Sequence, residues 1–254
     1  MFHRHGITFF ELVKAFFLPC DKAYDLIASK FIYTPFRTPD LILSAIAPHI
    51  GEIETIGAAL DICCGTGAGM QMLRPLCRDR LVGIDISQGL LDIARKYTSD
   101  KANRASLEFI HGNALDMTFD SEFDVAVCFG AMSHITTKYQ DRFLRAVARA
   151  LRPGGQFLFV SYYRPKIWSL RYWYYRIFNA FFFLRNLFLR PPWIVGKLHY
   201  CLPMIKNLLE NHGFEVQIID AFEGDLAWAK LVSARKKWPK ETDGDETASE
   251  AKNG

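Results

Sequence analysis

Apolar and polar residues alternate along the middle of the chain in blocks that are typical of an α/β protein. Short apolar runs are each followed by a longer segment in which apolar residues recur every three or four positions. Buried parallel strands have the first pattern, and the amphipathic helices that cover them have the second. The last two runs are joined by a short turn and predict an antiparallel hairpin. The expected strands are 58–63, 81–86, 106–111, 123–128, 157–162, 214–221 and 226–234.

The expected helices lie between these strands and in the first fifty residues. Asp21 has the position of an N-cap for the second N-terminal helix, and Pro39 begins the third. Ser87 precedes the helix after the second strand and can cap it, and Gly213 ends the last helix. The expected helices are 7–17, 21–31, 39–48, 68–77, 88–97, 141–151 and 204–212.

A glycine turn connects the first strand to its helix. Gly65, Thr66 and Gly67 leave backbone N–H groups open at the carboxyl end of the strand, and glycines let a ligand approach the backbone. Asp85 lies at the tip of the second strand, where an acid accepts hydrogen bonds from the hydroxyls of a ribose. A glycine turn alone is also common in ordinary loops. Together with Asp85, it predicts a nucleoside site.

The segment from Asp61 to Gly67 resembles motif I of the class I S-adenosylmethionine (SAM) methyltransferases. That motif reads acid-x-Gly-x-Gly-x-Gly, and this chain has Asp61, Cys63, Gly65 and Gly67 at the fixed positions. Cys63 departs from the motif, as a small residue in place of the first glycine. The resemblance covers roughly 41–235. Later phrases that resemble the same family, in the same order, are Gly112 to Asp116, Phe129 to Ile135 and Leu151 to Gly155.

This resemblance implies the fold and the division of the chain. We expect a doubly wound, mostly parallel, seven-stranded sheet of the Rossmann-like methyltransferase type. Lid helices are expected in residues 1–50 and the SAM-binding domain in 51–235, with an aromatic-rich helical insertion at 164–203 after the fifth strand. Residues 236–254 are polar and charged without apolar periodicity, which predicts a disordered tail.

The resemblance also implies SAM as the cofactor, held at the carboxyl ends of strands one, two and four. Asn113 stands where the family often has an acid near the adenine, and a simple surface turn is the alternative. Tyr24 and Tyr33 are candidates for contacts from the lid, and both are equally consistent with packing aromatics. The predicted cofactor-binding residues are Asp61, Cys63, Gly65, Thr66, Gly67, Asp85, Ile86, Asn113, Ala114, Cys128, Phe129, Tyr24 and Tyr33.

His134 follows the fourth strand at a place where the family often has a histidine. We predict that His134 is the catalytic residue, either as a general base or as a group that orients the acceptor. A base is needed only when the acceptor is a weak acid such as a phenol. Packing at the mouth of the site, or capping of the next helix, is the alternative for this residue.

The insertion 164–203 combines many large aromatic rings with arginine and lysine and contains no acidic residue. This composition is typical of a membrane–water interface or of a lid over a lipophilic substrate. On one straight helix, Arg171 and Arg185 share a stripe while Arg176 and Arg190 share another, so a bent pair of helices would give a cleaner charged face. A cap that packs on its own domain is the alternative.

The overall composition limits the other functions. The six cysteines have no CxxC or CxxxC spacing, which predicts thiols in a reducing compartment and no metal site. The net charge of +4 is small and the fourth strand lacks an Asn/Asp-Pro-Pro-Tyr phrase, so nucleic acid is not an expected partner. Glu11 and Lys14 interrupt the apolar N-terminus, so neither a signal peptide nor a membrane span is expected.

These features together predict SAM-dependent methyl transfer to a small lipophilic acceptor, such as a quinone precursor, an isoprenoid or a lipid. We expect a cytoplasmic protein that meets the inner face of a membrane, with the insertion 164–203 against anionic lipid. A non-catalytic, membrane-associated assembly or binding factor is the alternative. Intact Gly65, Gly67 and Asp85 favour the enzyme, because a protein that had abandoned SAM would not need them.

Overall fold

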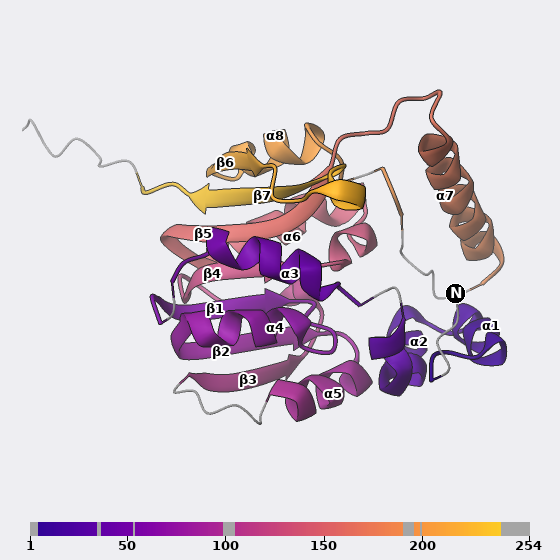
Figure 1. Cartoon of the computed structure of the whole chain (residues 1–254), viewed down its shortest axis with the longest axis horizontal. Helices are drawn as coiled ribbons and strands as arrows, with labels where there is room; N and C mark the ends of the chain where they lie inside the picture. The colour runs from indigo at the N-terminus through magenta and orange to yellow at the C-terminus, as the bar shows by residue number, and fades with distance from the viewer. Residues whose placement is uncertain are drawn as a thin grey trace, which may run out of the picture.

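Seven strands form one mixed sheet at the centre of the computed structural model. The structure describes residues 5–34, 37–52, 54–98, 105–189, 196–198 and 200–239. The strands are β1 (Ile56–Ile62), β2 (Cys77–Asp85), β3 (Ser106–His111), β4 (Phe123–Cys128), β5 (Leu151–Tyr162), β6 (Phe214–Ile219) and β7 (Ala229–Lys236). Their order is β3-β2-β1-β4-β5-β7-β6, and β7 is antiparallel to both of its neighbours while all other pairs are parallel (Figure 1). The expected seven-stranded fold is confirmed.

Helices cover both faces of the sheet. The helices are α1 (Phe9–Phe17), α2 (Cys20–Ile27), α3 (Asp40–Ile46), α4 (Ala68–Leu73), α5 (Gln88–Thr98), α6 (Thr137–Ala150), α7 (Leu170–Phe188) and α8 (Met204–Asn211). Side chains of α6 and α8 pack with one face of the strands, and side chains of α3, α4 and α5 pack with the other. None of the helices in the described ranges is long and apolar enough to cross a membrane.

The register of the central strands sets the position of the glycine turn. Asp61 pairs with Gly83 and Ile62 pairs with Ile84, so β1 and β2 end at nearly the same level. The backbone N–H of Cys64 then donates to the carbonyl of Ile84 at 3.1 Å. The turn after β1 therefore lies directly beside the tip of β2.

Local sequence rules place some element ends, and others differ from the expected ranges. α6 begins at Thr137 rather than at 141, and β5 begins at Leu151 rather than at 157. The Ser87 hydroxyl accepts from the N–H of Leu90 at 3.2 Å, which confirms its cap. The expected Asp21 cap is wrong: α2 begins one residue earlier, after Pro19, and Asp21 lies in its first turn. The helix expected through Cys77 ends at Leu73 in a short 3₁₀ turn that contains a proline, and Cys77 already belongs to β2.

The C-terminal end of the sheet extends slightly beyond the expected domain limit. β7 includes Lys236, one residue past 235, and the N–H of Lys237 donates to the carbonyl of Gly213 at 2.9 Å. Residues 240–254 lie outside the described part of the chain, so the disordered tail stays a prediction.

The lid helices α1 and α2 lie with α7 beyond the carboxyl ends of the parallel strands (Figure 1). The insertion forms one helix, α7, within its described residues, rather than the bent pair considered above. Arg185 corrects a second expectation. It is buried, and its guanidinium donates to the carbonyls of Phe16 and Leu18, so it does not face lipid. Arg190 lies outside the described residues.

Candidate active site

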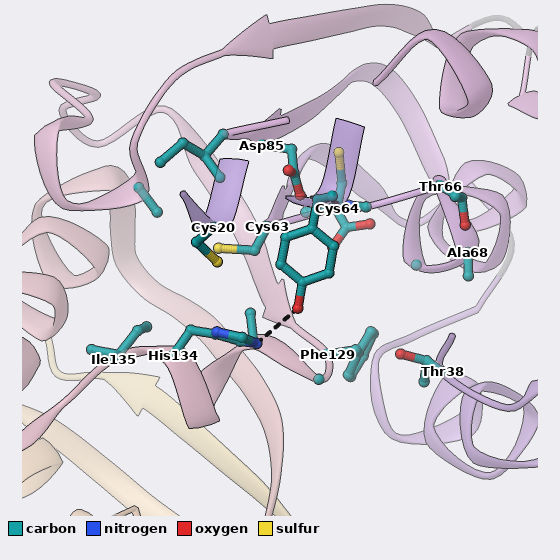
Figure 2. A pocket seen from close by; sticks show the side chains of 18 of the residues that line it. Cys20, Thr38, Cys63, Cys64, Thr66, Ala68, Asp85, Phe129, His134 and Ile135 are labelled. Carbon is teal, nitrogen blue, oxygen red and sulfur yellow. Dashed lines mark hydrogen bonds between the residues drawn. The ribbon is translucent and has the colours of Figure 1, made fainter. Parts of the chain in front are cut away.

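A cavity of about 380 Å³ lies at the carboxyl ends of β1, β2 and β4, and Cys20 and Tyr24 of the lid helix α2 are among its lining residues. Figure 2 shows side chains that line this cavity. Its size is within the range of small-molecule sites. The structure brings eleven of the fourteen predicted site residues to its lining: Tyr24, Asp61, Cys63, Gly65, Thr66, Asp85, Ile86, Asn113, Ala114, Phe129 and His134.

The three other predicted residues are not among those that line the cavity. Tyr33 is 42% exposed, and its ring contacts that of His5 at 5.9 Å between centroids. Cys128 is fully buried at the end of β4, next to Phe129, which does line the cavity. Gly67 packs against α5, and a Cβ on this residue would lie 3.1 Å from the side chain of Ala94. A glycine here therefore lets the turn lie close to that helix.

The turn after β1 needs left-handed backbone at three positions. Gly65 has φ +54 and Gly67 has φ +81, and nothing lies within 4 Å of a Cβ placed on Gly65. Cys63 has φ +57, a conformation that favours glycine and costs an L-residue about 1–2 kcal/mol. The family motif has glycine at this position, so the departure at Cys63 keeps the backbone conformation and adds a thiol to the cavity wall.

Asp85 is held at the tip of β2 by backbone donors. Its Oδ2 accepts from the N–H of Gly65 at 2.8 Å, and its Oδ1 accepts from the N–H of Ser87 at 2.9 Å. Burial raises the pKa of Asp85, and hydrogen bonds from the amides of Ser87, Gly65 and Ile86 oppose that rise. This carboxyl group faces the cavity beside the glycine turn, as expected for an acid that binds a ribose (Figure 2).

Asp61 is a buried acid with an unsatisfied oxygen. It is 2% exposed, lines the cavity, and its Oδ2 has no hydrogen-bond partner. Burial, and then the negative charge of Asp85, raises the pKa of Asp61 to about 8. A buried carboxyl group costs free energy unless a donor or a cation satisfies it. The arrangement therefore fits a ligand that carries positive charge.

His134 is paired with a lid residue across the cavity. It ends the 3₁₀ turn Ala131–His134 that follows β4, and its Nε2 lies 3.0 Å from the hydroxyl of Tyr24 (Figure 2). Burial strongly raises the pKa of Tyr24, so the phenol keeps its proton at neutral pH and can donate to an unprotonated His134. The two predicted residues therefore form one hydrogen-bonded unit.

Asp25 is a structural residue that the sequence reasoning missed. Its Oδ1 accepts from the hydroxyl of Ser87 at 2.7 Å and from the N–H of Gly89 at 2.9 Å, which fastens α2 to the start of α5. An acid near a helix N-terminus is stabilising, but nothing local in the sequence says that these two elements meet. Other lid residues at the cavity, also missed, are Cys20, Asp21, Arg37 and Thr38.

Comparison with known proteins matches this geometry. Residues 59–155 match the family described as a methyltransferase domain, which spans β1 to the beginning of β5. The sheet order, the glycine turn and the acid at the tip of β2 agree with that match. Residues 59–155 are thus a methyltransferase domain of the class I SAM-dependent type.

Several relatives of this methyltransferase have known names or structures. A demethylmenaquinone methyltransferase from Bacillus licheniformis is 32% identical over 128 residues, which are 48% of this chain and 51% of that protein. One from Symbiobacterium thermophilum is 25% identical over 166 residues, 64% of this chain and 65% of that protein. The chain thus matches about half to two thirds of the length of these curated relatives. The DhpI–SAH complex has the same fold, with a TM-score of 0.62 at 18% identity over 91% of this chain and all of that one.

The cavity fits the cofactor of this family. SAM carries a sulfonium and an ammonium group, and the unsatisfied oxygen of Asp61 can accept from or pair with a cation. The open space at Gly65 leaves the backbone accessible, and Asp85 offers a carboxylate for ribose hydroxyls. Within the described residues, no three His, Cys, Asp or Glu side chains are grouped to hold a metal ion.

Proposed function

We propose that this methyltransferase transfers the methyl group of SAM to a small, lipophilic acceptor at or near a membrane surface. The observation that carries the proposal is the unsatisfied Asp61 oxygen, which shares one cavity with Gly65 and Asp85. Bound SAM supplies an activated methyl group, so the protein has mainly to hold the acceptor in line with it. In this proposal Asp85 holds the ribose, Asp61 faces the cationic part, and the glycine turn lets the cofactor approach.

The lining of the cavity on the acceptor side supports a lipophilic substrate. Phe31, Phe129, Ala131, Ile135 and Phe143 are apolar lining residues from the lid and from the elements that follow β4. Such a surface gains free energy by burying apolar groups of a ligand. The Bacillus licheniformis relative is a demethylmenaquinone methyltransferase, so its name refers to a menaquinone precursor. A quinone precursor, an isoprenoid or another lipid is therefore the acceptor class that we propose.

His134 has the position of a base or an orienting group in this scheme. Its Nε2 is within hydrogen-bond distance of the Tyr24 hydroxyl, at the cavity. An acceptor phenol could replace Tyr24 as the donor to His134, or could bind beside the pair. We expect His134→Ala to lower turnover by about 10²–10⁴ if it removes a proton, with little change in SAM affinity. Tyr24→Phe serves as the matched variant that keeps His134 and removes only the hydroxyl.

The membrane part of the proposal rests on the insertion 164–203. Its exposed aromatic and cationic side chains, without an acid, favour contact with anionic lipid. We propose a cytoplasmic protein attached peripherally to the inner membrane face. A lipophilic acceptor would then be drawn from the bilayer rather than from water.

Calorimetry with SAM tests the cofactor site first. Wild-type protein should bind SAM, and Asp85→Ala should bind it about ten- to a hundredfold more weakly, because charge-assisted hydrogen bonds to the ribose are lost. Incubation with methyl-labelled SAM and lipid extracts should then label a lipophilic product. Absence of SAM binding by the folded protein would overturn the enzyme and favour a non-catalytic assembly factor.

A further inference from the structure

The outer side of α7 is an apolar stripe without a cover in the described structure. Its members recur every three or four residues, so they lie along one line of the helix. Each is between 52% and 90% exposed, although burying large apolar side chains is strongly favourable. The stripe consists of Leu170, Trp173, Ile177, Phe181, Leu184 and Phe188.

The first helix of the chain continues this stripe. Phe10 and Phe17 of α1 are 83% and 59% exposed. The rings of Phe16 and Phe181 lie 5.3 Å apart, and an open hollow lined by Phe17, Leu184 and Phe188 runs between the two helices. Residues far apart in the sequence therefore form one apolar surface, which we call the α1–α7 face.

Buried Arg185 holds the two helices of this face together. Its Nη2 donates to the carbonyl of Phe16 at 2.9 Å and to that of Leu18 at 3.1 Å, and its Nε donates to Phe16 at 3.1 Å. Its guanidinium also lies over the ring of Phe16. The arginine thus completes the unmade hydrogen bonds at the end of α1. Arg185 therefore stabilises the packing of α1 against α7 and is not one of the exposed charges of the α1–α7 face.

The charges beside the α1–α7 face are almost all positive. Arg164, Lys166 and Arg176 are exposed near α7, and Lys14 is exposed on α1. No acidic residue occurs from 164 to 206. The nearby acid of α1, Glu11, is neutralised by Lys30 at 2.6 Å. A protein partner of mixed charge would find almost no acidic groups to pair with its own cations. Anionic lipid headgroups, in contrast, would meet basic side chains throughout.

We propose that the α1–α7 face docks on an anionic lipid bilayer, with both helices lying in the plane of the interface. The inference rests on the membrane part of the proposed function and adds α1 as a second anchor. Tryptophan, tyrosine and phenylalanine rings flanked by lysine and arginine are suited to the boundary between headgroups and acyl chains. The face also lies at the same end of the sheet as the cavity (Figure 1).

The surface is placed to connect the bilayer with the cavity. α1 packs on α2 through a small apolar cluster that contains Ala15, Ala23 and Ile27. Tyr24, which follows Ala23 in α2, packs against this cluster and lines the cavity. A lipophilic acceptor that leaves the bilayer at α1 and α7 would therefore meet the lid directly.

Co-sedimentation with vesicles tests the docking surface on the full chain without SAM or acceptor. Wild type should pellet with phosphatidylcholine vesicles that contain phosphatidylglycerol and bind far less to phosphatidylcholine alone. Ile177→Glu and Phe10→Glu should each lower the partition coefficient by more than about tenfold, because a charge replaces an exposed apolar side chain that would enter the bilayer. Leu41→Glu on α3 is the matched control, since Leu41 and Ile177 are 69% and 68% exposed. Arg176→Glu should weaken binding to anionic vesicles by about tenfold.

Three results would overturn the proposal. Wild type could remain in the supernatant with both vesicle types, or Leu41→Glu could lose as much binding as Ile177→Glu. Sedimentation velocity could instead show a dimer that Ile177→Glu abolishes, which would assign the face to a second copy of the chain. Calorimetry with SAM in vesicle-free buffer separates this inference from the proposed function. SAM binding without vesicle binding would overturn only the docking proposal. Vesicle binding without SAM binding would overturn only the proposal of methyl transfer.

Discussion

Phenylalanine side chains are buried in the sheet region but exposed on the α1–α7 face. Those of the sheet and its covering helices, such as Phe143 and Phe157, are fully buried, whereas Phe10 and Phe188 are each 83% exposed. The two regions thus use the same residue type for different purposes. In the sheet region, apolar side chains on several elements converge and exclude water from both faces. In α1 and α7, the outward side chains have no element of the described chain above them. Apolar content alone therefore does not identify a core.

Phenylalanine-to-alanine substitutions test this comparison with the largest expected effect. Phe157→Ala should lower the free energy of unfolding by about 3–5 kcal/mol, because a cavity remains in the packed core. Phe183→Ala on α7 should change it by less than about 0.5 kcal/mol, since that ring is 64% exposed. Chemical denaturation measures both. A loss of similar size in the two variants would mean that α7 is covered in solution.

Arginine substitutions sharpen the comparison within α7 itself. Arg185→Ala should destabilise the protein by about 1–3 kcal/mol, because the carbonyls of Phe16 and Leu18 lose their donors. Arg176→Ala, on the exposed side of the helix, is the control and should have almost no effect. Hydrogen exchange should show faster exchange in α1 for the first variant only. Equal stability and equal hydrogen exchange in the two variants would contradict the role of Arg185 in joining α1 to α7.

The pH dependence of SAM affinity probes Asp61, a buried acid of the sheet region. In the protein without SAM, Asp61 keeps its proton up to a pH of about 8, because its pKa is raised to about 8. A cationic ligand favours the ionised carboxylate. Binding should therefore release a proton, so affinity should rise as the pH increases toward 8, by up to about tenfold per pH unit. Calorimetry in buffers of different ionisation enthalpy measures the released proton. Asp61→Asn should bind more weakly and lose this dependence, and an unchanged pH profile in that variant would exclude Asp61 as its source.

The smallest expected effect concerns the glycine turn of the same region. Cys63→Gly should raise the free energy of unfolding by about 1 kcal/mol, because glycine adopts φ +57 without strain. Cys64→Gly is the comparison, since Cys64 is a buried residue that is not among those with positive φ and should lose stability. Thermal or chemical denaturation distinguishes the two. Destabilisation by Cys63→Gly would show that the thiol contacts outweigh the strain.

Features fixed by neighbouring residues could be predicted from the sequence. The bounds of β3 and β4 agree with the predicted ranges, because each is a short segment between polar turns. Ser87 caps α5 as expected, since a cap depends on only the next three residues. The glycine turn and Asp85 were expected at one site because each lies at the carboxyl end of a predicted strand. These elements hold most of the cofactor side of the cavity.

Features that depend on contacts between distant segments could not be predicted. The hydrogen bond from Tyr24 to His134 joins residues 110 positions apart, and Asp25 reaches Ser87 across 62 positions. The close approach of Gly67 to Ala94 of α5 was not predicted either. Arg185 shows the same limit: charge and helical spacing suggested an outward arginine, while the packing of α1 against α7 buried it. Composition and periodicity contain no information on which elements meet.

The hydrogen bonds of Arg185 also limit how the lid helices can move. The two carbonyls that it holds, of Phe16 and Leu18, lie on either side of the joint where α1 ends and the chain turns into α2. An arginine fork is rigid, so it fixes the orientation of that joint as well as its position. Bending there would break three N–H···O contacts at once. We therefore expect α1, α7 and the α1–α2 joint to keep their relative orientation when cofactor or product exchanges.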